Sequence, residues 1–551
     1  MSGRLVLLLG LAMTSAASAQ APDSCLTGTA QVPLSNPQLE VQLFNTGGLF
    51  FGGTATSGDG YLIPKATGNS PFFAAGLWLG GKVGGELRVA GARFGNYHFW
   101  PGSLGENAQP PSDCAVYDRI YTVSREDIVR YYATGELADD LRDWPHVLGA
   151  PVMDGDGDPT NYNLSGGDQP SLIGERAAWW VMQDASHDHP NGTAPLGVEV
   201  RAHAFVYGGA REATSPAVSQ TLFIRYQVTN RRGTPIDSMY ASMWADPDLG
   251  DASDDYIGSD TLRNMAYVYN KFNEDVAYGT PPPAQGIQVL DGPIGLANGR
   301  DDDRDGQVDE RGERLRATAT TSFLKNPNAG NEPFTPQGYF NYMKGLWRDG
   351  TPVYDGWNGY QQPHFPVTTF PLAGDPVAQA FWSDMNYDGA GTRALTGDRR
   401  MAISTGPFRL APDSSATVLY AFPFGQGTDN LNSVAVMRGY AAALQRLYAE
   451  GFFASSPVER PERSFELALA RVRPNPSSGA AEAMLTLPDD AHVRAVVIDV
   501  LGRQLAVLAD GELAKGETIL QIPDGLAPGT YLLRVRVEPG GEETLTFTVA
   551  R

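Results

Sequence analysis

Short apolar runs separated by turn residues fill most of the chain between residues 33 and 453. The runs contain alternating or continuous apolar residues and lie between clusters of Gly, Pro, Asn and Asp; examples are residues 222–228, 265–269 and 416–422. Such runs are typical of β-strands, and their frequency favours β-sandwiches. We therefore expect a mainly β protein with one or two β-sandwich-like domains that carry long acidic loops.

Two segments have a helical period instead. Ser124 is followed three residues later by Asp127 and then by apolar residues, which is the pattern of a capped helix start. Residues 432–448 place apolar side chains at i, i+3 and i+4 spacing along one stripe, namely Val434, Met437, Ala441, Leu444 and Tyr448. This stripe predicts an amphipathic helix that packs over a sheet.

The pattern changes after residues 455–468, a charged, proline-containing segment without periodicity that we interpret as a linker. Beyond it aromatic residues become sparse. Short runs rich in Ala, Val and Leu predict strands at 467–472, 483–487, 493–500, 518–522, 530–537 and 544–549. Strands spaced this closely are typical of a small immunoglobulin-like β-sandwich.

Composition narrows the class of protein. At ~100–200 residues per domain, the 551 residues make about three domains the expectation. The 42% hydrophobic content is enough to build cores, and 63 acidic against 41 basic residues give a formal charge of −22. This charge argues against a nucleic-acid partner, because phosphates are neutralised by clustered Lys and Arg.

The N-terminus has the pattern of an export signal. Residues 1–19 contain Arg4, an apolar stretch at 5–13 and an A-x-A cleavage site at 17–19, so we interpret them as a signal peptide. A buried N-terminal helix is the alternative. No later stretch approaches the length of uninterrupted apolar residues that a membrane span needs, so we expect no transmembrane segment in the mature chain.

The sequence contains two cysteines, Cys25 and Cys114, and both lie in the exported part. An oxidising compartment permits a disulfide bond between them, while two free buried thiols are the alternative. A C-x-x-C pair or a Cys/His spacing typical of zinc sites is absent from the sequence.

Three ordered motifs follow the linker. Residues 472–479 read x-P-N-P-x-x-G, residues 497–505 form a strand–turn–strand unit around Gly502, and residues 526–535 form a turn that enters a strand. The last predicted strand, 545–549, stands almost at the C-terminus. This combination resembles the type A C-terminal sorting domain of cargo proteins of the type IX (Por) secretion system in Bacteroidota.

The resemblance implies a two-step export route. The signal peptide would direct the chain to the periplasm, and the outer-membrane secretion machinery would then recognise residues 469–551 and deliver residues 20–454 to the cell surface or the medium. In the family this domain is commonly cleaved; an ordinary accessory sandwich is the alternative here. Residues 20–454, with a suggested division near residue 235, resemble uncharacterised secreted proteins of the same bacteria at 73–82, 246–251 and 404–408.

Acidic loops are the strongest sign of site chemistry. Asp301, Asp303 and Asp305 precede Gly306 in the pattern D-x-D-x-D-G, with Asp309 and Glu310 beyond. Alternating carboxylates in a tight turn direct several oxygens to one centre, which suits the six to eight oxygen ligands of Ca²⁺. Gly312 occupies the position where an EF-hand has Glu, so a helix–loop–helix is not expected. A solvated acidic turn is the alternative.

Three further segments concentrate oxygen ligands. They are Asp384, Asn386 and Asp388; Asp154, Asp156 and Asp158; and Asp246, Asp248 and Asp251, the last set followed by Asp254, Asp255 and Asp260. Carboxylates crowded in this way repel one another unless a cation neutralises them. We hypothesise that structural Ca²⁺ folds these loops onto a sandwich scaffold, since Mg²⁺ prefers fewer protein ligands and more water.

Recognisable enzyme signatures are absent from the sequence, including G-x-S-x-G, H-E-x-x-H, a P-loop and G-x-G-x-x-G. His187 and His189 form a candidate transition-metal pair, with a polar loop as the alternative. Tryptophans could provide a sugar-stacking platform or simply fill cores; they are Trp100, Trp179, Trp180, Trp244, Trp347, Trp357 and Trp382. We therefore predict a secreted or cell-surface structural or binding protein, with surface polysaccharide as a candidate partner. The alternative is a polysaccharide-acting hydrolase.

Overall fold

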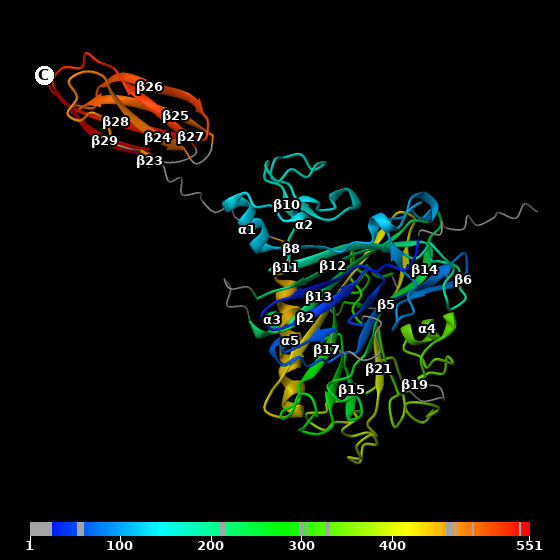
Figure 1. Ribbon diagram of the computed structural model, residues 1–551. Coiled ribbons are helices and arrows are strands. Elements are labelled where there is room, and N and C mark those ends of the chain that lie inside the picture. Colours follow the sequence, from blue (N-terminus) through cyan, green and yellow to red (C-terminus); the bar gives the residue numbers. More distant parts are fainter. Residues whose placement is uncertain are drawn as a thin grey trace, which may run out of the picture. The chain divides into compact units, whose positions relative to one another are not determined.

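The computed structural model describes most of the chain, and its described part forms two compact units (Figure 1). The first consists of residues up to Tyr131 and of Glu136–Val458, and the second of residues 132–135 and of residues within 459–551. The described residues are 25–51, 60–208, 215–296, 299, 301–303, 306–324, 331–455, 457–458, 468–469, 471–487, 490–538 and 542–550. The predicted signal peptide and most of the predicted linker lie outside them. Within these ranges, no helix has both the length and the apolar character needed to cross a membrane.

Two large antiparallel sheets build the first unit, and each has nine strands among the described residues. The first sheet has the order β1 (Gln31–Ser35), β2 (Glu40–Phe44), β3 (Gly48–Leu49), β5 (Ala74–Val83), β14 (Ile236–Asp246), β21 (Arg399–Leu410) and β18 (Ala319–Leu324), with β4 (Tyr61–Leu62) paired to β2 and β6 (Glu86–Gly91) paired to β5. The second sheet has the order β15 (Asp255–Asp260), β16 (Met265–Asn270), β17 (Ala284–Asp291), β22 (Ser415–Gly425), β13 (Thr221–Asn230), β12 (Val198–Val206), β11 (Arg176–Gln183) and β7 (Trp100–Pro101), with β8 (Tyr121–Ser124) paired to β11.

The main core lies between these two sheets. Leu77 and Met243 of the first sheet and Ile224 and Tyr420 of the second belong to one continuous buried cluster. Burying this apolar surface stabilises the fold by roughly 25 cal/mol per Å². The prediction of a mainly β, sandwich-like fold is confirmed.

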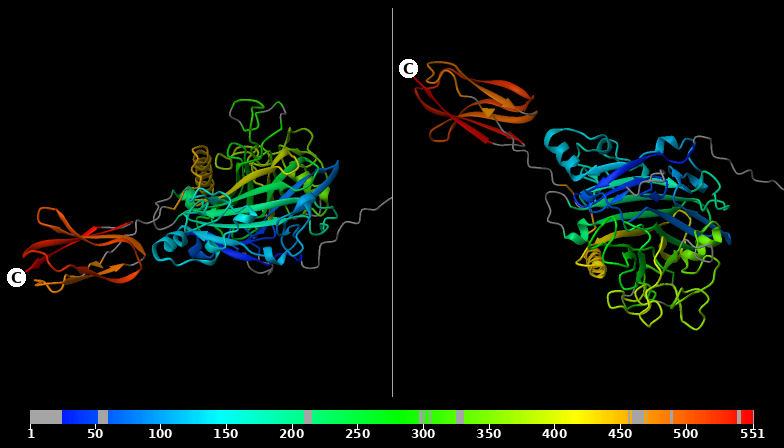
Figure 2. Two further views of the ribbon diagram at one scale, coloured as in Figure 1. Left: turned by 90° about the horizontal axis from the view of Figure 1, so that it is seen from above. Right: turned by 60° about the horizontal axis from the view of Figure 1, so that its bottom comes forward.

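Helices cover the outer faces of both sheets. Helix α4 (Pro336–Met343) packs its Tyr342 and Met343 with Trp78 and Trp244 of the first sheet. Helix α5 (Asn430–Ala449) packs Val434 and other apolar residues on the second sheet. Figure 2 shows the ribbon from two further sides. Because central strands are thus buried on both faces, β16 and β22 have continuous apolar runs rather than a strict alternation.

The two predicted helices are present. Four residues of the expected stripe of α5 are buried, namely Val434, Met437, Ala441 and Leu444. The helix starts at Asn430 because the Asp429 carboxylate accepts the N–H of Asn432 at 2.8 Å. Helix α1 (Arg125–Thr134) begins with a reciprocal capping box, since the Ser124 hydroxyl accepts the Asp127 N–H and the Asp127 carboxylate accepts the Ser124 N–H.

Short elements complete the first unit. They are α2 (Asp139–Arg142), α3 (Pro216–Ser219), the 3₁₀ turns Lys65–Thr67, Glu106–Ala108, Ala115–Tyr117 and His146–Leu148, the hairpin of β9 (Val152–Met153) with β10 (Gln169–Pro170), and the hairpin of β19 (Val353–Tyr354) with β20 (Val367–Thr368).

Cys25 and Cys114 form a disulfide bond, so the sequence-based alternative of two free thiols does not hold. Residue 235 lies in the turn between β13 and β14, and each large sheet contains strands from both sides of it.

The second unit is a small β-sandwich. Its described strands form a three-stranded sheet and a four-stranded sheet. The first contains β23 (Ala468–Leu469), β24 (Ala481–Leu487) and β27 (Gly516–Ile522); the second contains β26 (Gln504–Leu513), β25 (Ala491–Asp499), β28 (Gly529–Glu538) and β29 (Glu542–Val549). Its own buried core includes Leu485, Val493, Leu533 and Phe547.

Candidate functional site

A cavity of about 820 Å³ opens in the first unit beside β18 and β21. We call it the aromatic cavity, because five aromatic side chains that lie between these strands in sequence line it: Trp347, Trp357, Tyr360, Trp382 and Tyr387. Its volume is within the ~300–1,000 Å³ that is usual for small-molecule sites. Polar side chains of Thr321, Ser322, Asn358, Gln361 and Thr392 also line it.

Two tryptophans hold the turn that carries a third. The indole N–H of Trp382 donates to the carbonyl oxygen of Trp357 at 2.9 Å, and that of Trp347 donates to the carbonyl oxygen of Gly359 at 2.9 Å. Trp357 also meets Tyr387 edge-on, with ring centroids 5.8 Å apart. The aromatic walls are therefore fixed by directional contacts as well as by packing.

Exposure separates the tryptophans into two sets. Trp357 is 45% exposed at the aromatic cavity, whereas Trp382 is only 3% exposed and supports it from below the surface. Four others are buried in the sheets, namely Trp100, Trp179, Trp180 and Trp244. Core filling, one of the two alternatives from the sequence, therefore holds for these four tryptophans, while the ring of Trp357 stays accessible at the cavity.

The lining of the aromatic cavity contains several residues with a strained backbone. Three described, non-glycine residues of the lining have positive φ angles: Trp357 at 52°, Gln361 at 54° and Leu372 at 58°. This left-handed region costs a non-glycine residue on the order of 1–3 kcal/mol, and such residues cluster at ligand sites. The surrounding contacts must therefore compensate the strain.

The charged groups of the lining are Asp384, Arg393 and Arg399. Asp384 is buried, accepts the N–H of Ile257 at 3.0 Å and lies 3.3 Å from the guanidinium of Arg399. Burial raises the pKa of the Asp384 carboxyl, and Arg399 opposes that rise. Arg393, by contrast, is exposed, so the lining has one acidic and two basic side chains.

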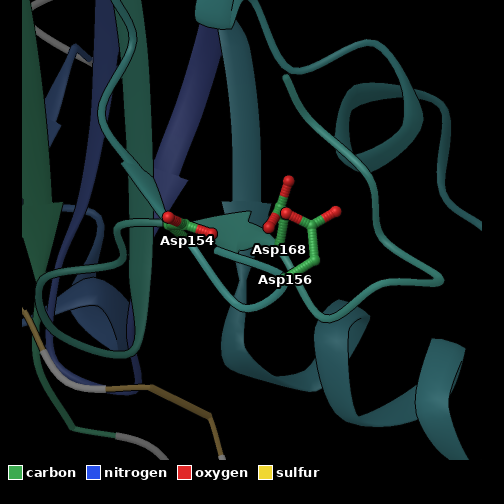
Figure 3. A group of neighbouring side chains, drawn as sticks. All are labelled: Asp154, Asp156 and Asp168. Atoms are coloured by element: carbon green, nitrogen blue, oxygen red, sulfur yellow. The ribbon is translucent and has the colours of Figure 1, made fainter. Parts of the chain in front are cut away.

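Three groups of carboxylates could each hold a metal ion among the described residues, with their oxygens within 4.8 Å of one another. One of them consists of Asp154, Asp156 and Asp168 (Figure 3). In the β9–β10 hairpin Met153 pairs with Gln169, so the next residues outward, Asp154 and Asp168, come to stand opposite each other. Figure 3 shows the carboxylates of Asp156 and Asp168 turned toward each other.

Backbone N–H groups hold the carboxylates of this hairpin. The buried Asp168 accepts the N–H of Gly155 at 2.9 Å and that of Asn163 at 2.6 Å. The N–H of Asp158 and then the amide of Asn163 lower the pKa of Asp156, so this carboxyl is ionised at neutral pH. Asp158 itself lies outside the group, and Thr160 binds its carboxylate. This geometry suits a hard cation.

The second group contains Asp246, Asp248 and Asp398. Asp246 ends β14 directly opposite Arg400 of β21, and the two side chains form an ion pair. Arg400 also pairs with Asp398 and Glu332. Because a guanidinium already neutralises part of this cluster, it is a poorer cation site than the β9–β10 hairpin.

The third group contains Asp301, Asp303 and Glu313. The bridge between Ile294 and Arg314 closes this loop and brings the buried Glu313 under the aspartates. Asp305 lies outside the described residues. The carboxylate of Asp309 accepts the N–H of Gly299 at 2.8 Å, and Glu310 is not part of the group.

The remaining acidic segments have other partners. While Asp384 faces Arg399, Asn386 accepts the N–H of Gly391 at 3.0 Å and Asp388 accepts that of Ala390 at 2.8 Å. Asp251 accepts the N–H of Ser253, and its own N–H donates to Asp275. These alternating oxygens stabilise turns, which is the other common use of Asp and Asn in loops.

The side chains of the candidate histidine pair, His187 and His189, contact main-chain oxygens. Nε2 of His187 lies 2.7 Å from the carbonyl oxygen of Cys25. The buried His189 places Nδ1 2.8 Å from the carbonyl oxygen of Val89 and Nε2 2.9 Å from that of Asp184. Main-chain oxygens occupy these ring nitrogens, so the two side chains fix loops instead of sharing a metal.

Comparisons with known proteins add little to this geometry. The chain matches no protein-family model and no curated protein. A solved structure described as a polysaccharide lyase is 10% identical over 64% of this chain and 34% of that one, with a TM-score of 0.17. A Faecalibacterium prausnitzii β-glucuronidase is 18% identical over 29% of this chain and 30% of that one, with a TM-score of 0.12. The chain thus spans about a third of the length of each.

Proposed function

We propose that this protein is an exported binding protein that takes a saccharide in the aromatic cavity. The observation that carries the proposal is the half-exposed Trp357, held by Trp382 and flanked by the amides of Asn358 and Gln361. Flat aromatic faces pack against the C–H faces of sugar rings, and amides and hydroxyls exchange hydrogen bonds with sugar hydroxyls.

Binding is better supported than hydrolysis. A glycosidase needs two carboxyl groups that flank the scissile bond. In the described lining Asp384 is the one carboxylate, and it already pairs with Arg399. The alternative of a polysaccharide-acting hydrolase therefore has no specific observation in its favour at this cavity.

Calorimetry with purified protein and a panel of neutral and acidic oligosaccharides tests the proposal. We expect Trp357→Ala to weaken saccharide binding by about tenfold or more, because truncating an aromatic anchor at the centre of a site removes most of its contact. Phe272→Ala is the matched control, since Phe272 is a half-exposed aromatic residue outside the lining. Absence of binding to every member of the panel, or equal binding by both variants, overturns the proposal.

We also propose that Ca²⁺ stiffens the loops of this unit, above all in the β9–β10 hairpin. The three carboxylates of Asp154, Asp156 and Asp168 lie close enough to share an ion, and their described partners are uncharged groups. Bound Ca²⁺ would raise the melting temperature, because it binds the folded state and not the unfolded one. Melting curves that are identical with Ca²⁺ and with chelator overturn this part.

Export by the type IX route is the third part of the proposal. The motifs at 472–479, 497–505 and 526–535, and the separate fold of the second unit, support a role of residues 469–551 as the signal for the outer-membrane secretion machinery. Expression of the chain truncated after Val458 in a bacterium with this system tests it. We expect the truncated chain to stay in the periplasm; normal delivery to the surface or medium contradicts the proposal.

A further inference from the structure

We infer that the saccharide in the aromatic cavity carries an acidic group, a carboxylate or a sulfate, and that Arg393 recognises it. This inference rests on the proposed function and adds the ligand's charge and the residue that selects it. It starts from the balance of charges around the cavity.

The lining of the aromatic cavity has one more basic than acidic side chain, although the protein is acidic. The whole chain has a formal charge of −22. In the described lining, Asp384 and Arg399 neutralise each other and Arg393 remains, so that the net charge is +1. A site for neutral sugars has no need of an additional cation, whereas an acidic sugar gains a charge-assisted hydrogen bond from it.

Two carboxylates stay negatively charged just outside the lining. Asp349 and Asp388 are close in sequence to lining residues but do not line the cavity. Asp349 accepts the hydroxyl of Tyr360 at 2.9 Å and the N–H of Thr351 at 2.9 Å. The N–H groups of Ala390 and Thr392 bind the carboxylate of Asp388. Both acids are thus engaged in turns that shape the wall.

The backbone around Arg393 is fixed while its side chain is available. Thr392 accepts the N–H of Tyr387 at 2.8 Å, and the N–H of Ala394 donates to the carbonyl oxygen of Asp384 at 2.8 Å. The Arg393 side chain is exposed and, among the described residues, forms no ion pair or hydrogen bond. Its guanidinium, with a planar fork of N–H donors, matches the two oxygens of a carboxylate or two oxygens of a sulfate.

Arg393 is placed to select an acidic sugar, because it lies on the turn next to the aromatic wall. Arg393 and Tyr387 belong to one turn, and Tyr387 contacts the ring of Trp357. A sugar ring stacked on Trp357 would therefore present its substituents toward the turn that bears Arg393. A small anion that lacks a sugar ring would bind to this turn more weakly than an acidic sugar, because it would make no contact with the aromatic wall.

Calorimetric titration with three oligosaccharides of equal length tests the inference: a neutral one, one that contains uronate, and one that contains sulfate. We expect Arg393→Gln to weaken binding of at least one acidic saccharide by about tenfold and to leave the neutral one unchanged. Arg393→Lys should restore part of the affinity. Arg409→Gln is the matched control, because Arg409 is exposed and pairs with Asp237 away from the lining.

The outcomes separate the two proposals. If saccharides bind in a Trp357-dependent manner but Arg393→Gln changes nothing, the inference is overturned and the proposed function stands. If acidic saccharides bind equally to wild type and Trp357→Ala, attraction is non-specific and both fail. If none of the three binds, both fail as well. Loss confined to the uronate or to the sulfate identifies which acid the cavity accepts.

Discussion

The indole N–H of Trp382 donates a hydrogen bond to the main-chain carbonyl oxygen of Trp357 at 2.9 Å, so a buried tryptophan orients an exposed one. Trp357 needs such support, because its φ of 52° is unfavourable for any side chain with a Cβ atom. The contact links packing inside the unit to the surface that we propose as the binding site.

Replacing Trp382 by Phe keeps most of the ring but removes this donor. We expect a loss of stability of about 1 kcal/mol, since the partly buried carbonyl oxygen of Trp357 loses its donor, together with weaker saccharide binding. Denaturant unfolding and calorimetry measure the two effects. Trp180→Phe is the control, because the buried Trp180 nitrogen has no hydrogen-bond partner among the described residues. Equal losses in both variants would show that the hydrogen bond is not what matters.

The disulfide between Cys25 and Cys114 joins residues 89 positions apart in sequence. Closing a loop of this length restricts the unfolded chain and stabilises the protein by roughly 4–5 kcal/mol in the chain-entropy model. We expect the double variant Cys25→Ala, Cys114→Ala to unfold at lower urea concentration. A reducing agent should destabilise wild type and leave the variant unaffected; a variant as stable as wild type contradicts the prediction.

The calcium proposal can be tested by comparing two aspartates of one loop. Asp168 belongs to the carboxylate group of the β9–β10 hairpin, while Asp158 belongs only to the sequence pattern and binds Thr160. We expect Asp168→Asn to abolish most of the rise in melting temperature that Ca²⁺ produces, and Asp158→Asn to retain it. The quantity to compare is the difference with and without Ca²⁺, since Asp168 also binds two backbone N–H groups.

Asp254 makes stability depend on pH. Burial, followed by repulsion from Asp275 and Asp251, raises the pKa of Asp254 from 3.8 to about 6. The folded state therefore binds more protons than the unfolded state between these values, and stability falls as pH rises from about 4 to 6. Asp254→Asn should be more stable than wild type at pH 7.5 and similar at pH 3.5, with solvent screening limiting the gain. Chemical unfolding in chelator measures both; a variant less stable at pH 7.5 refutes the prediction.

Two buried histidines act in the opposite direction. Burial lowers the pKa of His98 and of His203 from 6.5 to about 3. The unfolded state then binds more protons between pH 3 and 6.5, so stability is fully present above 6.5 and falls as pH drops. His203→Leu removes one of these groups, and we expect its acid unfolding midpoint, followed by tryptophan fluorescence, to shift to lower pH. An unchanged midpoint would assign acid sensitivity to other groups.

Local patterns in the sequence were sufficient for the mainly β character, for the strand runs named in the sequence analysis and for both longer helices. Residues 416–422 became the centre of β22, and the stripe that starts at Val434 became the buried face of α5, because these patterns reflect burial directly. Strand β26 was indicated only at its start, by the strand–turn–strand unit at 497–505, and its extent to Leu513 was not predicted. Its side chains are mostly exposed or half-buried, so its apolar pattern is weak.

The candidate sites were less predictable than the fold, because their residues meet through pairing of distant strands. Asp168, Asp398 and Glu313 complete the three carboxylate groups, yet no spacing in the sequence connects them to the alternating aspartates. Conversely, Asp384 fits an alternating motif, but an arginine from β21 reaches its carboxylate. The sequence showed how many tryptophans the chain has but not which of them reach the surface. The structure shows that Trp357, on its turn, is exposed at the aromatic cavity.

The path of the chain around the aromatic cavity has a consequence for protein engineering. The chain leaves the first sheet at Leu324 and returns at Arg399, and these two residues are register partners on neighbouring strands. Helix α4 shields the sheet early in this excursion, and the later part, residues 344–398, is tied to both sheets, because the carbonyl oxygens of Thr369 and Leu372 accept the N–H groups of Thr320 and Ser259. Replacing the whole segment would remove these anchoring bonds, so ligand preference is better exchanged by substituting exposed lining residues one at a time while the main-chain contacts of Thr369 and Leu372 are kept.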